Sequence, residues 1–390
     1  MTFSFRRIEG YRRRFVHEWS QWQARRECGR RRLAFQQWLA HLRSSPPQVM
    51  VGANFAEYGG VRGHLQAIKR YSKHDVQLAP PENLLHRIGT HSFTNEFRED
   101  FLDFPAKGVR VAHSHVFPWF IEWCQHHQKN GLRWIHTYHL NYYPEHGKNG
   151  EVEPWQQQIN DAMLNQARFA DECLSVSKWQ VVELREQHGI EARYLPNGVD
   201  VAFCDQGRED RFRNKHQLQR FVLFVGRNDP VKNPMEFVKL ARRIPEEVFV
   251  MIGGDLSVET LATVGEPTLP ANLRILGGLN PMDVQDAIAA SSLVVVTSKR
   301  EGLPTLVLEA MTHETPLVVP DEAGCMEAID CGRFGDIYHL GNIDDLERKV
   351  RSTIRLGRRD CGARRRVLEE YDWRMVMQKL DGIYAGKSAP

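Results

Sequence analysis

Two glutamates, Glu301 and Glu309, lie eight positions apart in the stretch LVVVTSKREGLPTLVLEAM, which predicts a strand, a short polar loop and a helix. The unbroken run from Leu293 to Val296 is rich in β-branched residues, as is typical of a parallel strand that is covered on both faces. Pro304 suits the first position of the following helix, because its fixed φ fits a helix and its missing N–H would have no partner there. We therefore expect Glu301 in the loop and Glu309 about a turn and a half into the helix.

This geometry points free N–H groups around Gly302, Leu303 and Thr305 out of a helix N-terminus at the carboxyl end of a strand, a place that attracts phosphate. An ionised carboxylate only accepts hydrogen bonds, which suits both glutamates to holding sugar hydroxyls. The alternative is that Glu301 is a solvated loop residue and Glu309 a surface residue of an amphipathic helix. The stretch alone leaves both interpretations open.

Two cations follow another predicted strand, from Phe221 to Val225. Arg227 and Lys232 lie in the loop GRNDPVKNP. Fixed cations at the carboxyl end of a strand can stabilise the charge that develops on a departing phosphate. An arginine and a lysine in a loop are usually just solvated, so this interpretation depends on the neighbouring elements.

A glycine pair marks the first half of the chain. Val49 to Val51 predicts a strand, and Gly59 and Gly60 lie in the loop before a predicted helix from Val61 to Tyr71. Adjacent glycines let a backbone come close to a phosphate, although a plain tight turn is the alternative.

Histidines mark the next two predicted strands, Val109 to His115 and Leu132 to His139. His113 and His115 are two positions apart, so on a strand both side chains face the same way, as a metal-binding pair would. No cysteine or carboxylate follows at a suitable spacing. We therefore expect no metal site in this protein.

The composition limits the classes of protein to which this chain can belong. The chain has 390 residues, of which 42% are hydrophobic and 26% charged, enough for two or three domains with sizeable cores. No apolar run approaches the ~18 residues needed to cross a bilayer. The seven cysteines are scattered without a CxxC pair, and the start shows no signal-peptide pattern, so we expect reduced thiols and a cytoplasmic protein.

The first 45 residues differ from the rest, because they hold eleven arginines against three glutamates while the net charge of the whole chain is only +3. An aromatic stripe (Ile8, Tyr11, Phe15, Trp19 and Trp22) and a second apolar stripe (Leu33, Trp38, Leu39 and Leu42) predict a basic amphipathic helical arm. Such an arm suits an anionic membrane surface. Packing against the protein itself and nucleic-acid binding are the alternatives, and we expect no nucleic acid.

The spacing of Glu301 and Glu309 within EGLPTLVLEAM resembles the Glu-x7-Glu signature of retaining glycosyltransferases of the GT-B fold, family 4 type (glycosyl transferases group 1). The resemblance implies that Glu309 holds the ribose of a nucleotide and that Glu301 lies near the donor sugar. It also implies that Gly302, Leu303 and Pro304 meet the phosphate and the sugar through their backbone.

Other motifs carry the same resemblance in the family's order. GRNDPVKNP resembles the loop whose arginine and lysine, here Arg227 and Lys232, neutralise the leaving diphosphate. GGVRGH, with Gly60, resembles the loop that approaches the diphosphate, and Thr137-Tyr138-His139 resembles the pattern that places a histidine, here His139, near the donor sugar. LRILGGL, with Gly277, resembles the end of the strand at the nucleobase pocket. Cys325 departs from the family's GGxxE segment, which leaves the acceptor side undefined.

The resemblance implies an α/β fold with two Rossmann-like domains facing across a cleft. We expect the arm at 1–45, an acceptor domain at 46–205, a nucleotide-sugar domain at 206–371 and a terminal helix at 372–390 that crosses back to the acceptor domain. It implies retaining, metal-independent and cofactor-free transfer of a sugar from a nucleoside diphosphate sugar to a glycan or lipid-linked acceptor. From the basic arm we expect the protein to act at the inner face of the membrane. An epimerase or a scaffold of the same fold is the alternative.

Overall fold

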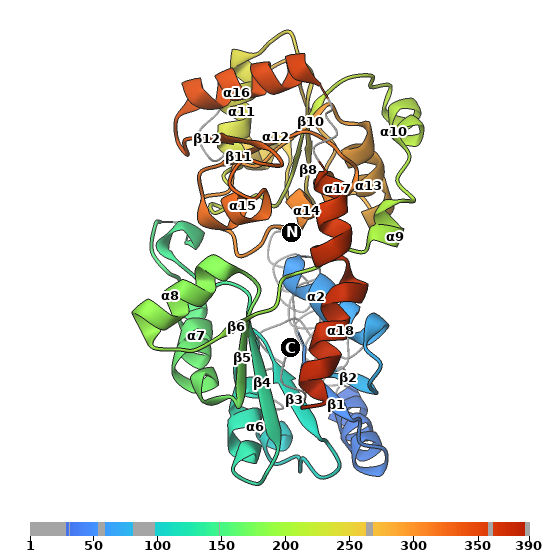
Figure 1. Ribbon diagram of the computed structural model, residues 1–390, viewed down its shortest axis with the longest axis vertical. Helices are drawn as coiled ribbons and strands as arrows, with labels where there is room; N and C mark the ends of the chain where they lie inside the picture. Colours follow the sequence, from blue (N-terminus) through green and yellow to red (C-terminus); the bar gives the residue numbers. More distant parts are fainter. Residues whose placement is uncertain are drawn as a thin grey trace, which may run out of the picture.

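The computed structural model describes residues 29–30, 32–53, 59–80, 98–147, 149–262, 268–357 and 362–386. It contains two six-stranded parallel sheets, one in each half of the chain (Figure 1). Both are flanked by helices, as parallel sheets require when both of their faces are buried. The expected α/β fold with two Rossmann-like domains is confirmed.

The first sheet has the strand order β2-β1-β3-β4-β5-β6. Its strands are β1 (Val49–Gly52), β2 (Val76–Ala79), β3 (Val111–Ser114), β4 (Arg133–Tyr138), β5 (Glu172–Ser175) and β6 (Arg193–Tyr194). Strands β3 and β4 end one residue earlier than predicted, so His115 and His139 are the first residues beyond their carboxyl ends. The helices of this half are α2 (Gly60–Tyr71), α5 (Arg98–Leu102), α6 (Pro118–Gln128), α7 (Pro154–Asp161) and α8 (Lys178–His188), and a π-helical turn, Ala162–Gln166, continues α7.

The second sheet has the strand order β12-β11-β10-β7-β8-β9. Its strands are β7 (Val222–Val225), β8 (Phe249–Ile252), β9 (Leu273–Ile275), β10 (Leu293–Val295), β11 (Leu317–Pro320) and β12 (Asp336–Tyr338). The helices are α9 (Val201–Cys204), α10 (Glu209–His216), α11 (Pro234–Arg243), α12 (Val258–Ala262), α13 (Pro281–Ala290), α14 (Thr305–Thr312), α15 (Ala323–Ala328), α16 (Ile343–Leu356) and α17 (Ala363–Arg366). Strands β10 and β7 are hydrogen-bonded neighbours, so the two loops that carry the predicted donor site leave the sheet side by side.

Helix α14 begins one residue later than predicted. Pro304 has an extended backbone (φ −71°, ψ 113°) and caps the helix, which begins at Thr305. The prediction that Pro304 occupies the first helical position is therefore wrong. The physical reason is that the fixed φ of proline is equally compatible with the cap, where an extended ψ turns the chain into the helix.

The chain returns to the first domain at its end (Figure 1). Helix α18 (Trp373–Tyr384) buries Trp373, Val376 and Leu380 in one cluster with Val51 and Ile135 of the first sheet. This single helix thus links the second half of the chain to the core of the first.

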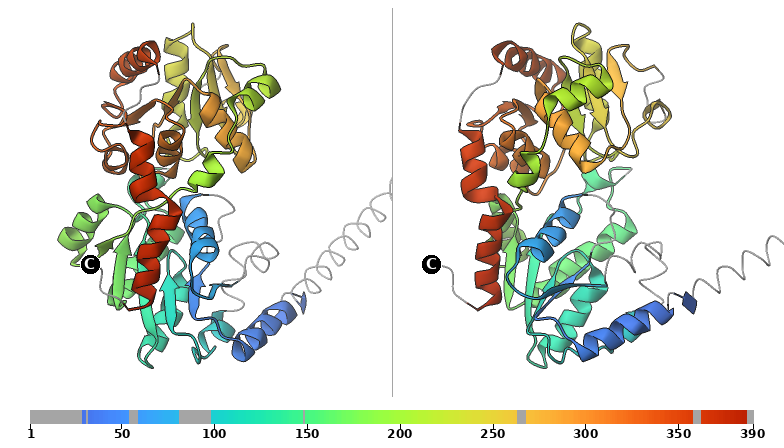
Figure 2. Two further views of the ribbon diagram at one scale, coloured as in Figure 1. Left: turned by 45° about the vertical axis from the view of Figure 1, so that its right-hand side comes forward. Right: turned by 90° about the vertical axis from the view of Figure 1, so that its right-hand side faces the viewer.

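Part of the basic arm belongs to the first domain. Residues 32–44 are helical and lie along the base of this domain (Figure 2). Phe35, Leu39 and Leu42 are buried in the core cluster that contains Phe101, and Trp38 stacks on the Phe101 ring with the centroids 6.0 Å apart. Leu33, which was expected in the same stripe, is 57% exposed.

The second apolar stripe therefore packs against the protein itself. The aromatic stripe from Ile8 to Trp22 lies outside the described residues. No helix in the described part of the chain is both long and apolar enough to cross a membrane.

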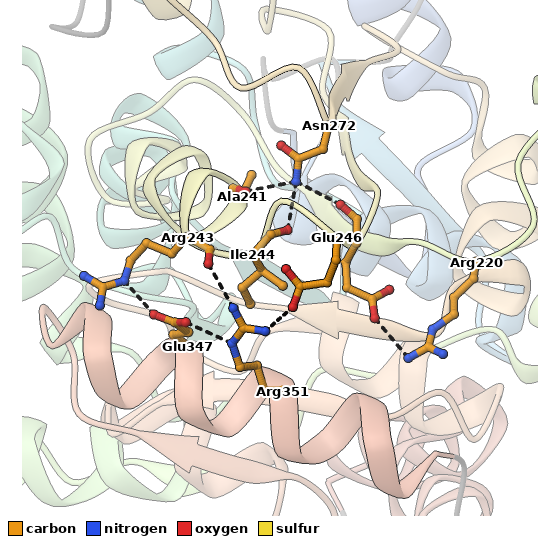
Figure 3. A network of polar contacts seen from close by, with 9 residues as sticks. Arg220, Ala241, Arg243, Ile244, Glu246, Asn272, Glu347 and Arg351 are labelled. Carbon is orange, nitrogen blue, oxygen red and sulfur yellow. Dashed lines mark hydrogen bonds and ion pairs between the residues drawn. The ribbon is translucent and has the colours of Figure 1, made fainter.

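A polar network holds two helices of the second domain together (Figure 3). The amide nitrogen of Asn272 donates to the carbonyls of Ala241, Ile244 and Glu247 at 2.8–3.0 Å, at the end of α11. Arg351 on α16 donates to Glu347 at 2.9 Å and to the carbonyl of Arg243 at 3.0 Å. This network fixes α11, whose first residues follow the Lys232 loop.

Candidate functional site

A cleft of about 1470 Å³ lies between the two domains, at the carboxyl ends of both sheets. Ten of the eleven predicted site residues line it: Gly60, His139, Arg227, Lys232, Glu301, Gly302, Leu303, Pro304, Thr305 and Glu309. Gly277 is not among the lining residues, whereas its neighbour Gly278 is. Residues from four separate segments of the chain therefore meet in one space.

One cation and one carboxylate form an ion pair in this cleft. The Nζ atom of Lys232 lies 2.5 Å from Oε1 of Glu301, across the gap between the loops after β7 and β10. Thr297 donates to the carbonyl of Lys232 at 2.9 Å, which ties the two loops together. Glu301 is 9% exposed, so it is not the solvated loop residue of the alternative interpretation.

Arg227 lies at the open side of the same loop. Its guanidinium pairs with Asp229 at 3.0 Å, and its side chain is 62% exposed. An exposed arginine can swing toward an anionic ligand at little energetic cost, because its own ion pair is screened by solvent. Lys232 is thus a cation held by an ion pair inside the cleft, and Arg227 is an exposed one.

The loop before α14 touches the opposite domain. A Cβ atom at Gly302 would lie 2.2 Å from the carbonyl oxygen of His139, so only glycine fits at this contact. Trp179 donates from its indole nitrogen to the carbonyl of Gly302 at 2.9 Å, and Asn197 donates to the carbonyl of Leu303 at 3.3 Å. These bonds orient the loop that precedes the N-terminus of α14.

Glu309 lies in the second turn of α14, in the wall of the cleft. Gln285 of α13 donates to its carboxylate at 2.9 Å, and the Oε1 atom of Gln285 lies 2.9 Å from Nε2 of His313. Burial raises the pKa of Glu309 to about 7, and the bond from Gln285 opposes the rise. Glu309 is therefore not a solvated surface residue.

Sequence reasoning missed Gln285. The only signal was its place on the buried face of a short predicted helix, which does not show that it orients Glu309.

Four buried histidines, His64, His113, His115 and His139, cluster where the ends of β3 and β4 meet α2. A fifth buried histidine, His136, bonds Ser114 at 2.8 Å. Burial lowers the pKa of His64 to about 4 and the pKa values of His113, His115 and His139 well below their usual range. All of these imidazoles are therefore neutral at pH 7.

The rings of His113 and His115 lie 4.3 Å apart, on the same side as the spacing predicted. They do not form a metal-binding pair, because His113 bonds Tyr384 and Thr137, each at 2.7 Å, through its two nitrogens. Instead, His115 bonds His139 at 2.9 Å, and His64 lies beside both rings. The contribution of His64 could not be predicted, since the sequence places it on a different element.

Glu327, the glutamate of the GGxxE-like segment, bonds the first domain. Its carboxylate accepts from the backbone N–H groups of Lys178 at 2.8 Å and Trp179 at 3.0 Å, at the N-terminus of α8. A carboxylate is favoured there by the free N–H groups and the helix dipole. Cys325, the residue that departs from the family pattern, is fully buried.

Two family models match the chain in succession. Glycosyltransferase Family 4 matches residues 56–203, and Glycosyl transferases group 1 matches residues 206–370. Together they span both domains.

Curated relatives match with low identity. A putative teichuronic acid biosynthesis glycosyltransferase of Bacillus subtilis is 25% identical over 214 residues, which are 53% of this chain and 49% of the relative. A UDP-Gal:alpha-D-GlcNAc-diphosphoundecaprenol alpha-1,3-galactosyltransferase of Escherichia coli is 29% identical over 173 residues, which are 39% and 42% of the two chains. The chain thus spans about half the length, or less, of these relatives.

Solved structures agree on the fold. Anabaena HepE in complex with UDP-glucose superposes with a TM-score of 0.68 at 16% identity, over 87% of this chain and 100% of that chain. Sucrose-phosphate synthase of Thermosynechococcus elongatus superposes with a TM-score of 0.67 at 17% identity, over 87% and 98%. At this level of identity the likeness shows the shared two-domain architecture alone.

Proposed function

We propose that this chain, which belongs to the group 1 and family 4 glycosyltransferases, moves a sugar from a nucleoside diphosphate sugar to a hydroxyl of a glycan or lipid-linked acceptor. The proposal includes retention at the anomeric carbon and no requirement for a metal ion or cofactor. The observation that carries it is the cleft in which Lys232, Glu301 and Glu309 meet the N-terminus of α14. The names of the relatives, which include a glycosyltransferase acting on a diphosphoundecaprenol lipid, support an acceptor of this kind.

The donor nucleotide would lie against the second domain. Glu309 would accept hydrogen bonds from two ribose hydroxyls, with Gln285 holding the other side of its carboxylate. The base would lie near Gly278, one residue beyond the predicted Gly277. The diphosphate would lie between Arg227 and Lys232, and Gly302, Leu303 and Thr305 would supply backbone N–H groups at the helix N-terminus.

The sugar would lie between the domains. Glu301 and His139 face the cleft from opposite domains, and the carbonyl of His139 approaches Gly302 closely. Gly60, at the start of α2, would let the backbone approach the diphosphate from the first domain. In the retaining route, the acceptor hydroxyl attacks the face from which the diphosphate departs, and the leaving phosphate oxygen takes the acceptor proton. This route needs no side chain as general base.

Slow donor hydrolysis tests the proposal. Each of a set of nucleotide sugars, beginning with UDP-glucose, is incubated with the full chain, and release of the free nucleoside diphosphate is measured with and without excess EDTA. We expect one donor to be hydrolysed and EDTA not to abolish the reaction. Loss of activity in EDTA that magnesium or manganese restores would contradict the metal-free mechanism, and no release from any donor would contradict the function itself.

Replacing Glu309 with alanine should weaken the binding of the nucleoside diphosphate by roughly ten- to a hundredfold. The reason is that a charged acceptor lost from a buried hydrogen-bonding site costs about 1.5 to 3 kcal/mol. Titration calorimetry measures the affinity. Glu314→Ala, two residues beyond the end of α14 and outside the cleft, is the control and should bind normally. Unchanged affinity in Glu309→Ala would remove Glu309 from the site.

The affinity for the same ligand should fall as the pH falls through about 7. Burial raises the pKa of Glu309 to about 7 in the free protein, and the ribose hydroxyls would bind the ionised form. Protonation therefore competes with the ligand, and the affinity should drop about tenfold per pH unit well below that pKa. The Glu309→Gln variant has no titratable group at this position, so the pH dependence of its affinity shows the part that comes from titration of the ligand itself. If the wild type and this variant show the same pH dependence, Glu309 is not the group responsible.

A further inference from the structure

We propose that His64, His115 and His139 form a binding site for one transition-metal ion such as Zn²⁺, and that the bound ion inhibits the enzyme. This site lies in the first domain, apart from the diphosphate region between Arg227 and Lys232. The inhibition, but not the binding, rests on the function proposed above.

The three rings already stand close to the arrangement that a metal requires. One ring nitrogen from each lies within 4.8 Å of the other two. Their ring centroids are 5.4, 4.8 and 5.2 Å apart. Three imidazoles around a tetrahedral ion, each bound at about 2.0–2.1 Å, have nitrogens about 3.3 Å apart and centroids roughly 5 Å apart. Small side-chain rotations would therefore close the site around an ion.

The hydrogen bonds of Asn197 fix the tautomer of His64. The amide nitrogen of Asn197 donates to the carbonyl of Leu303 at 3.3 Å, so its oxygen is the atom that faces His64 Nδ1 at 3.0 Å. His64 Nδ1 must then carry the proton and donate it. Its Nε2 consequently presents a lone pair, yet this buried atom has no hydrogen-bond partner among the described residues. Metal-bound histidines have this pattern, with the second nitrogen donating to a fixed oxygen.

His115 and His139 complete the set of ligands. Nδ1 of His115 and Nε2 of His139 lie 2.9 Å apart and share one proton. The other nitrogen of each ring is buried without a hydrogen-bond partner in the described part of the chain. The shared proton would move to the other nitrogen of its own ring, which keeps both imidazoles neutral, and an ion could then bind the two facing nitrogens if they opened by a few tenths of an ångström. The neighbouring His113 cannot take part, because Tyr384 and Thr137 occupy both of its nitrogens.

The donor set selects the kind of ion. Neutral imidazoles suit Zn²⁺, Co²⁺, Ni²⁺ and Cu²⁺, whereas Mg²⁺ and Mn²⁺ prefer oxygen ligands. Three histidines leave one tetrahedral position open, and this position can be reached from the cleft because His139 lines it. An ion held there would tie His139 to His64 and His115, so His139 would no longer be free to contact the donor sugar.

Calorimetric titration of the metal-free full chain with Zn²⁺ tests the binding. We expect the wild type to bind one ion at this site and His115→Gln to bind it at least tenfold more weakly. His126→Gln, on the exposed side of α6, and His136→Gln, a buried neighbour that is not one of the three ligands, should retain the wild-type affinity. Thermal unfolding shows that each variant is folded. Equal affinity in His115→Gln and the wild type, or no binding by the wild type, would overturn the proposal.

Two further measurements do not depend on a buried histidine variant. Asn197→Ala should weaken Zn²⁺ binding by about ten- to a hundredfold, the usual effect of removing the group that orients a metal-bound histidine. Co²⁺ in place of Zn²⁺ should give the visible absorption of a tetrahedral complex. An octahedral spectrum would overturn the assignment to these three rings.

Donor hydrolysis tests the inhibition separately. Added Zn²⁺ should inhibit the wild type at the concentrations at which calorimetry shows binding, and EDTA should restore activity. Donor hydrolysis that proceeds unchanged with Zn²⁺ bound would overturn the inhibition. An enzyme without transferase activity but with the expected Zn²⁺ binding would overturn the proposed function and leave the metal site standing.

Discussion

Replacing Lys232 with alanine should lower turnover by on the order of a hundredfold or more. Lys232 is held beside Glu301 at 2.5 Å, at the carboxyl end of β7, where the proposed diphosphate departs. A cation fixed before the reaction stabilises the developing negative charge without having to reorganise, and this is why its removal affects the transition state more than the bound substrate. The loss should therefore appear mainly in kcat and only weakly in KM.

Controls separate this effect from damage to the fold. Lys215→Ala removes a lysine that pairs with Asp283 at 2.7 Å outside the cleft, and it should leave turnover unchanged. Lys232→Arg keeps the positive charge and should recover part of the activity. Because Lys232→Ala leaves Glu301 partly buried without its partner, thermal unfolding must confirm a folded variant. A folded Lys232→Ala that turns over within a few-fold of the wild type would remove Lys232 from the chemistry.

The donor side of the cleft could be predicted because its residues are local in sequence. The run before Glu301 specifies a buried strand, and the eight-residue spacing to Glu309 specifies a loop and a helix, so the positions of both carboxylates follow from short-range geometry. The errors here are small. Pro304 caps the helix instead of starting it, and Gly278 faces the cleft in place of Gly277.

The histidine cluster could not be predicted, because it depends on register between distant elements. His64 comes from α2, whereas His115 and His139 follow β3 and β4. They meet only because β3 pairs with β4 in the observed register and α2 packs over their ends. The spacing of His113 and His115 correctly predicted that both side chains lie on one face of a strand. It could not show that Tyr384, near the end of the chain, forms a hydrogen bond with Nδ1 of His113.

The arm illustrates a further limit of periodicity. An apolar stripe predicts that a helical face is covered, but it does not say by what. Phe35, Leu39 and Leu42 are covered by the first domain, while the more N-terminal aromatic stripe remains a predicted membrane contact. The two segments should therefore respond differently to truncation.

A protein that begins at Gly29 should keep its thermal stability but lose its sedimentation with anionic liposomes. It lacks seven arginines, each of which contributes about 1 kcal/mol near an anionic surface at low salt. The aromatic residues Phe15, Trp19 and Trp22, which would bury their rings at the headgroup boundary, are lost as well. Full-length protein that ignores anionic liposomes at low salt would contradict membrane binding by this segment.

A protein that begins at Pro46 should in contrast aggregate or melt many degrees lower, because it also loses Phe35, Leu39 and Leu42 from the core of the first domain. Removing even one such side chain costs about 2–5 kcal/mol, against a total of about 5–15 kcal/mol for a typical domain. Leu39→Ala and Leu33→Ala form a matched pair on this helix, since Leu39 is 5% and Leu33 57% exposed. Chemical unfolding should show a loss of about 2–5 kcal/mol for Leu39→Ala, and a change within about 0.5 kcal/mol for Leu33→Ala. If the two variants unfold alike, or the protein that begins at Pro46 melts like the full chain, residues 32–44 are not part of the core.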